Sequence, residues 1–237
     1  MNQWQEFEQP TNWISSSTET TFEREQAFLR YAWSWMFGGL MLTATTAFAV
    51  AITPALQQLV FNPTAAIVLM IATLGIVVFL SFRVTKLSPG MAGGLFIAYA
   101  ILNGLMLSGI LFVYTGATIV SAFVTAAGMF GAMAIYGTVT KRDLTSWGSF
   151  FFMGLIGVIL ALVINFFVKS SALDGTIAIV GVFVFVGLTA WDAQKLKAYA
   201  AAAGPQVTQY AVIGALALYL DFINLFLMLL RLFGRRN

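Results

Sequence analysis

The last apolar run of the chain, ALALYLDFINLFLMLLRLF at Ala215–Phe233, predicts more about this protein than any other stretch. As a helix it is long enough to cross the roughly 30 Å hydrocarbon layer of a bilayer. It nevertheless contains Asp221, with Asn224 one turn further along the same face. A carboxylate at that depth costs on the order of 3 kcal/mol, and such residues usually face a bundle interior or a water path. The run therefore predicts a membrane-spanning helix that carries a functional acid.

A second acid, Asp192, lies in the preceding apolar run, GVFVFVGLTAWDAQKLK at Gly181–Lys197. Four alanines and a Gly-Pro pair join the two runs, which favours two helices connected by a tight turn. If the first helix ends at Ala203 and the second begins at Tyr210, each acid lies about 16 Å from the tip of this hairpin. We therefore expect Asp192 and Asp221 to meet at the same depth, just inside the cytosolic half of the membrane.

The composition excludes several classes of protein. Of 237 residues, 60% are hydrophobic and only 9% are charged, so most of the chain must face lipid or other helices. Cysteine and histidine are both absent, which excludes a disulfide framework, a thiol nucleophile, an imidazole base and the histidine-ligated zinc of seven-helix hydrolases. The net charge of +3 comes from basic residues that stand singly or in pairs between apolar runs, so we expect no nucleic-acid partner.

The apolar runs predict an all-α integral membrane protein with seven transmembrane helices. Residues 1–20 are polar and are expected to form a flexible tail, followed by a seven-helix transmembrane domain over residues 21–237. Thr20 and Glu23 fit a capping box at the start of the first helix. Each run has about the 20 residues needed to cross a bilayer, and the runs are Tyr31–Ile52, Thr64–Phe82, Met91–Tyr114, Ala117–Val139, Trp147–Val168, Thr176–Gln194 and Ala215–Phe233.

The loops predict the orientation of these helices. With a cytosolic N-terminus, that side of the membrane receives most of the basic residues outside the C-terminus, as the positive-inside rule requires. Seven crossings then place the C-terminus on the far side. The basic C-terminal end, Arg231 with Arg235 and Arg236, is the feature that disagrees with this orientation.

Two carboxyl groups in contact at low dielectric share a proton more readily than both ionise. Such a pair is expected to be hydrogen-bonded in acid and separated by repulsion in alkali. A gap between ionised carboxylates also suits a hard cation such as calcium, with the carbonyl of Asn224 as a further ligand. An alternative stays open: each acid is simply neutralised by a neighbour, and Asp192 would then pair with Lys195 or Arg83.

Several stretches closely resemble the Bax inhibitor-one family, also called the transmembrane Bax inhibitor motif family. They are LYLDFINLFLMLLRLFG at Leu218–Gly234, VGLTAWDAQKLK at Val186–Lys197, and the segment Tyr114–Gly148. The bacterial YbhL/YccA/YetJ-like branch of the family is the most similar. The resemblance extends from about Tyr31 to the C-terminus.

This resemblance implies a fold in which the last helix is central and the other six wrap it. It also implies a bacterial inner membrane protein that conducts a pH-sensitive calcium leak, with Asp192 and Asp221 as sensor and gate and Arg83 as a latch to that pair. Relatives of the YccA kind are associated with a membrane-embedded AAA protease, which makes such a protease a possible partner of the N-terminal tail. No bound cofactor is expected apart from calcium. Unlike some members, the run Thr64–Phe82 contains no acid.

Two other functional classes compete with a proton-sensitive leak. In the first, the bundle is a scaffold that modulates a protease or a stress response without transporting ions, and the acids are structural. The second is an enzyme, because two membrane aspartates are also found in intramembrane aspartyl proteases. Those enzymes need a Gly-x-Gly-Asp pattern, and Asp221 follows Leu218-Tyr219-Leu220 instead. We therefore expect no enzymatic activity.

Overall fold

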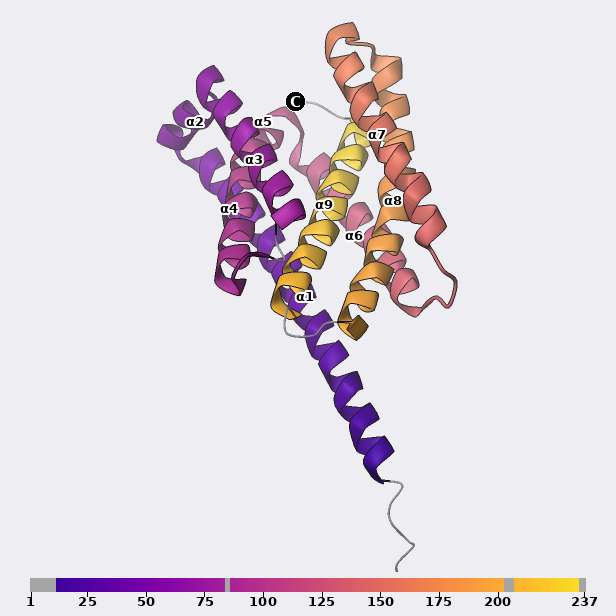
Figure 1. Ribbon diagram of the computed structural model, residues 1–237. Coiled ribbons are helices and arrows are strands. Elements are labelled where there is room, and N and C mark those ends of the chain that lie inside the picture. Colours follow the sequence, from indigo (N-terminus) through magenta and orange to yellow (C-terminus); the bar gives the residue numbers. More distant parts are fainter. Residues whose placement is uncertain (1–11, 84–85, 203–206, 235–237) are drawn as a thin grey trace, which may run out of the picture.

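The computed structural model describes residues 12–83, 86–202 and 207–234. Within these residues the chain forms nine helices, seven of which are long and apolar enough to cross a membrane, while α2 and α5 are short connectors (Figure 1). The helices are α1 Asn12–Ile52, α2 Pro54–Val60, α3 Pro63–Arg83, α4 Pro89–Leu107, α5 Ile110–Val113, α6 Gly116–Val139, α7 Thr145–Val168, α8 Ser171–Ala202 and α9 Val207–Phe233. The predicted all-α fold with seven candidate spans is confirmed.

Proline and hydroxyl side chains start several of these helices. Proline occupies the first turn of α2, α3 and α4, where its missing amide proton costs nothing. The side chains of Ser88 and Thr115 accept hydrogen bonds from backbone amides in the first turns of α4 and α6, as N-cap residues do. At the other end of α7, Lys169 adopts a left-handed conformation with φ 55° and ends the helix.

Several helix boundaries differ from the prediction, and three of the differences are instructive. Helix α1 begins at Asn12 and not near Thr20, because no glycine or proline lies between Asn12 and Phe37 to interrupt it. Residues 12–20 are thus helical, and residues 1–11 of the predicted tail lie outside the described residues. Helix α8 begins at Ser171, before the predicted run that starts at Thr176. The third predicted run divides near Ser108 into α4 and α5.

Helix α9 lies in the middle of the bundle (Figure 1). It packs against α1, α4, α6 and α8, whereas α3 packs mainly on α4 and α7 packs on α8. The span of α9 is accordingly the most buried of the seven, and the spans of α3 and α7 are the least buried. The C-terminal helix is thus central, as expected, but four helices wrap it directly and α3 and α7 form an outer layer.

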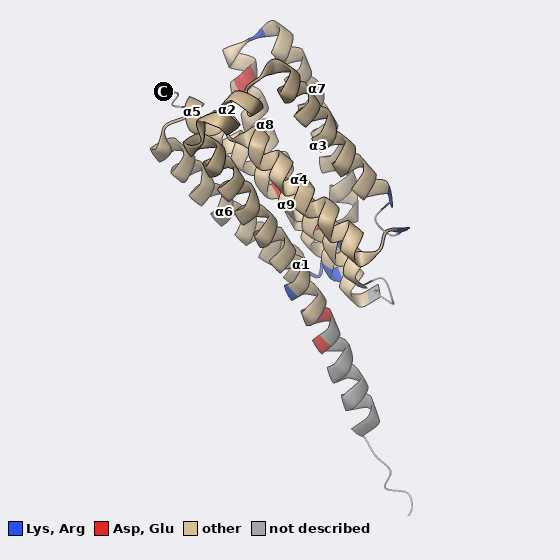
Figure 2. Ribbon diagram, turned by 90° about the vertical axis from the view of Figure 1, so that its left-hand side faces the viewer, with Lys and Arg blue, Asp and Glu red and all other residues tan. Residues whose placement is uncertain are grey.

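The start of α1 and the end of α9 lie at opposite ends of the bundle (Figure 1). Figure 2 shows that most charged segments gather near these two ends, and that the long middle of the bundle carries few charges, among them an acidic segment at α9. This distribution is typical of a chain whose middle lies in hydrocarbon.

Candidate functional site

The structure brings Asp192 and Asp221 together. Helices α8 and α9 form the predicted antiparallel hairpin and are the most closely packed pair in the bundle. The carboxyl groups of Asp192 on α8 and Asp221 on α9 lie within hydrogen-bonding reach of each other. Two ionised carboxylates have no hydrogen to donate, so this contact requires a proton on one of them.

The two acids differ in their surroundings. Asp221 is only 4% exposed, and its Oδ2 atom has no hydrogen-bond partner among the described residues. Asp192 is partly exposed. A buried carboxyl oxygen without a partner is costly, and a proton, a water molecule or a cation would satisfy it. The pair therefore has one fully buried acid and one acid that is partly exposed.

Lys195 lies one turn after Asp192 on the same helix, and its charge acts on the Asp192 carboxyl group. Its Nζ atom is 4.7 Å from the ring centroid of Trp191 and 5.8 Å from that of Tyr199. Contacts of this kind between an ammonium group and aromatic faces are attractive. The two rings thus hold the ammonium group close to the acid pair.

Arg83, the expected latch, is not at the pair. It is exposed in the last turn of α3, and α3 belongs to the outer layer that packs on α4. Among the side chains that the structure describes, the one ion pair joins Arg231 to Asp174 at 2.9 Å, and Arg83 has no ionic partner. The expected latch contact is therefore not formed in this structure, because α3 does not pack closely on either acid-bearing helix.

Asn224, the expected additional cation ligand, is half-buried on α9. Its Nδ2 atom donates to the backbone oxygen of Leu220 at 2.8 Å, which leaves the carbonyl oxygen as the group that a cation would use. In the described part of the chain, no three acidic side chains lie together. Calcium takes six to eight oxygen ligands, so a calcium ion here would need water or backbone carbonyls as its other ligands.

Two residues that the sequence did not single out connect α8 to neighbouring elements. Gln194 accepts a hydrogen bond from the backbone amide of Leu144 and donates one to the backbone oxygen of Arg142, both at 2.8 Å. Lys197 donates to the backbone oxygen of Thr138 at 2.8 Å. The turn of α8 that follows Asp192 is therefore fastened to the end of α6 and to the α6–α7 loop. The signal that could have revealed it is the polar cluster QKLK next to an intramembrane acid.

Replacing Gln194 with leucine should release the α6–α7 loop from α8. The two lost hydrogen bonds leave the amide of Leu144 without its partner, at a cost of about 1–2 kcal/mol. Hydrogen–deuterium exchange of the peptide that contains Leu144 should become faster, while exchange in the α4 segment stays unchanged. Equal exchange in both proteins would show that the loop is held by other contacts.

Tyr219, two residues before Asp221, anchors α9 to α1 and α4. Its hydroxyl lies 2.7 Å from Thr43 Oγ1 and accepts from Asn103 Nδ2 at 2.9 Å. Thr43 Oγ1 donates to the backbone oxygen of Ala100 at 2.9 Å, so Tyr219 is the donor to Thr43. Thr43, Asn103 and fully buried Tyr219 thus form a satisfied polar network within the apolar bundle. The sequence signal for this network was a tyrosine within a predicted membrane span, since its hydroxyl needs a hydrogen-bond partner there.

The chain also resembles known proteins. Residues 25–237 match the Bax1-I family, described as inhibitor of apoptosis-promoting Bax1. The inner membrane protein YbhL of Escherichia coli K12 is 50% identical over 217 residues, which are 90% of this chain and 93% of YbhL. Uncharacterized proteins of Deinococcus radiodurans and Rickettsia prowazekii are 41% and 39% identical, with 94% of this chain covered in each case and 97% and 95% of the relatives.

The family match covers the acid pair, the central helix and all seven spans. Its extent agrees with a fold that is one seven-helix unit. The chain, an integral membrane protein, therefore belongs to the Bax1-I family.

Proposed function

We propose that this protein is a pH-sensitive leak pathway for cations, calcium in the first place, with Asp192 and Asp221 as its sensor and gate. The observation that supports the proposal is the contact between two acids on the central helix hairpin, one of them buried with an unpartnered oxygen. Acids within membrane spans usually mark ion or proton pathways. The resident membrane is proposed to be the bacterial inner membrane, with a cytosolic N-terminus.

In the proposed mechanism, one shared proton keeps α8 and α9 together at acidic pH. Loss of that proton leaves two negative charges in a medium of low dielectric, where they repel strongly. The repulsion separates the carboxylates, and calcium replaces the proton as the charge that compensates them. Lys195 stabilises the ionised form of Asp192 from the side of the aromatic rings, and Arg83 would reach the pair only in a different conformation.

The test is calcium flux into liposomes that contain the purified protein, measured with a trapped dye from about pH 5 to about pH 8. Wild type should show flux that rises with pH, and Asp221→Asn should show flux that does not depend on pH. Glu25→Gln, which changes an acid on α1 and leaves the α8–α9 hairpin intact, is the control and should behave like wild type. Identical pH profiles for wild type and Asp221→Asn would contradict the proposal.

Two basic variants test how the pair is compensated. Lys195→Gln should move the rise in flux to higher pH, because the ionised form of Asp192 loses a positive neighbour. Arg83 does not contact either acid in this structure, so Arg83→Gln should leave the pH midpoint of the flux unchanged. A shift with Arg83→Gln alone would assign the latch to Arg83 instead.

One observation supports the alternative, a scaffold that modulates a membrane-embedded protease. Helix α1 continues from Asn12 to the start of its membrane span at Glu25, and Figure 1 shows this part projecting from the bundle. A projecting helix is an accessible segment for a partner. Deletion of residues 1–20 distinguishes the two functions: a cellular phenotype that disappears with this deletion but survives Asp192→Asn would favour the scaffold.

A further inference from the structure

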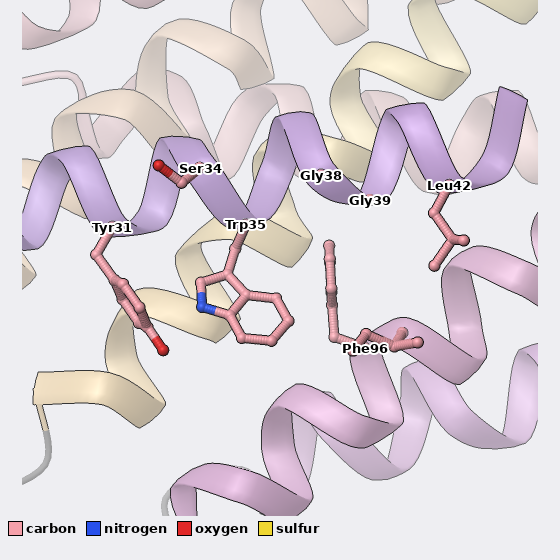
Figure 3. A pocket seen from close by; sticks show the side chains of 8 residues that line it. Tyr31, Ser34, Trp35, Gly38, Gly39, Leu42 and Phe96 are labelled. Carbon is pink, nitrogen blue, oxygen red and sulfur yellow. The ribbon is translucent and has the colours of Figure 1, made fainter. Parts of the chain in front are cut away.

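A groove of about 500 Å³ lies between α1 and α4, away from the acid pair. It is lined by Tyr31, Ser34, Trp35, Gly38, Gly39, Leu42, Phe96 and Ile97. Figure 3 shows Tyr31, Trp35 and Leu42 extending from α1 towards the helix that carries Phe96. Tyr31 and Ile97 are 40% and 44% exposed, and both belong to membrane spans. The groove therefore opens towards lipid.

The two ends of the groove differ in polarity. Figure 3 places the hydroxyl groups of Tyr31 and Ser34 and the indole nitrogen of Trp35 towards one end and Leu42 towards the other, with the ring of Phe96 between them. The polar end is the N-terminal end of the α1 span, which begins at Glu25. Tyrosine and tryptophan prefer this interfacial level of a bilayer. The groove is therefore polar at the headgroup level and apolar below it, as a lipid molecule is.

The groove follows the register of the α1 helix. Its residues on α1 recur four positions apart, as in Ser34, Gly38 and Leu42, so they form one continuous face. A Cβ atom placed on Gly38 would have no atom within 4 Å, so the absent side chain leaves open space. Arg30 is exposed and precedes Ser34 by four residues, and the Ser34 hydroxyl donates to its backbone oxygen at 2.8 Å. The same face thus continues into a positive charge.

We propose that this groove, the Gly38 groove, binds one membrane phospholipid, with an acyl chain along Gly38 and its phosphate beside Arg30, Tyr31 and Ser34. Hydrophobic transfer does not drive this binding, because the chain leaves one apolar medium for another. Close packing against rigid helix walls and the attraction of a cation for the headgroup provide the preference. The inference does not depend on the proposed leak.

The test uses detergent-purified full-length protein and added phosphatidylglycerol, with bound lipid counted by native mass spectrometry. Wild type should hold one lipid more tightly than the rest. Gly38→Phe fills the groove and should weaken this lipid about tenfold. Gly75→Phe is the matched control, because Gly75 also has open space around its Cβ position but lies on α3. It should bind like wild type.

The headgroup is tested separately. Arg30→Gln should weaken the tight lipid about fivefold, the effect of removing about 1 kcal/mol of attraction per basic residue at the surface, whereas Lys141→Gln in the exposed α6–α7 loop should not. If Gly38→Phe lowers the unfolding midpoint, Ser34→Phe at the polar end replaces it. The site would be overturned if the groove-filling variant bound lipid as tightly as wild type, or if Gly75→Phe weakened binding equally. The position of the phosphate would be overturned if Arg30→Gln left lipid binding unchanged.

Discussion

Replacing Gly137 with alanine is expected to destabilise the bundle by about 3 kcal/mol, at the upper end of what overpacking usually costs. A Cβ atom at this position on α6 would overlap the backbone oxygen of Ala190 on α8. A backbone atom cannot rotate away as a side chain can, so the two helices would have to separate. The measurement is the unfolding midpoint in a denaturing detergent titration.

Gly131→Ala is the matched control for Gly137→Ala. Both glycines lie on α6, but a Cβ atom at Gly131 would have no atom within 4 Å. Alanine favours helix over glycine by up to about 1 kcal/mol, so Gly131→Ala should leave stability unchanged or raise it slightly. Equal destabilisation by the two variants would mean that α6 and α8 do not approach as closely as the structure shows.

The second large effect concerns the pH dependence of stability at the acid pair. The contact between Asp192 and Asp221 needs a proton, so its contribution is present at low pH and is lost as pH rises and both groups ionise. The unfolding midpoint of wild type should therefore fall with rising pH. Asp221→Asn keeps the shape and supplies its own donor, and its midpoint should stay level over the same range.

A double-mutant cycle then measures the coupling directly. Asp192→Asn, Asp221→Asn and the double variant should give an interaction energy of about 0.5–3 kcal/mol that changes with pH, as residues in contact do. Additive effects at every pH would show that the two acids act independently. That result would also remove the basis of the proposed gate.

The stabilising effect of Asp143 should change with pH in the direction opposite to that of the acid pair. The hydroxyl and the amide of Thr145, which both donate to the Asp143 carboxylate, lower the pKa of that carboxyl below its ordinary value of 3.8. A carboxyl whose pKa is lowered by folding stabilises the protein above its ordinary pKa, and this stabilisation is lost as pH falls through the lower folded value. A loss of stability with rising pH therefore cannot come from Asp143.

Much of the fold could be predicted from the sequence. The seven apolar runs match the seven spans because a helix that crosses hydrocarbon needs about twenty mostly apolar residues in a row, and such runs are easily recognised in a sequence. Helical rise also led to the prediction that Asp192 and Asp221 meet, although α9 begins at Val207 and not at the predicted Tyr210. The start of α1 was predicted too late, because a capping box that fits the pattern at Thr20 lies within a longer helix.

The site was only partly predictable. The sequence pointed to the acids, since charges are rare in apolar runs, but it did not point to the Gln194 contacts with the α6–α7 loop or to Tyr219 as the partner of Thr43 and Asn103. Polar side chains of this kind occur on many helices, and only their partners distinguish them. The position of Arg83 could not be derived either, because the layer in which α3 lies depends on how the helices pack.

The sequence by itself determined that this chain crosses a membrane with seven helices, that two acids lie at one depth, and where most helices end. Only the tertiary structure decided which faces meet, that α9 is central, and that α3 stands apart from the acids. The physical reason is that lipid and the bundle interior are both apolar. In water, a helix shows its inward face through its pattern of polar residues, but in a bilayer the inward face is selected by close packing between helices.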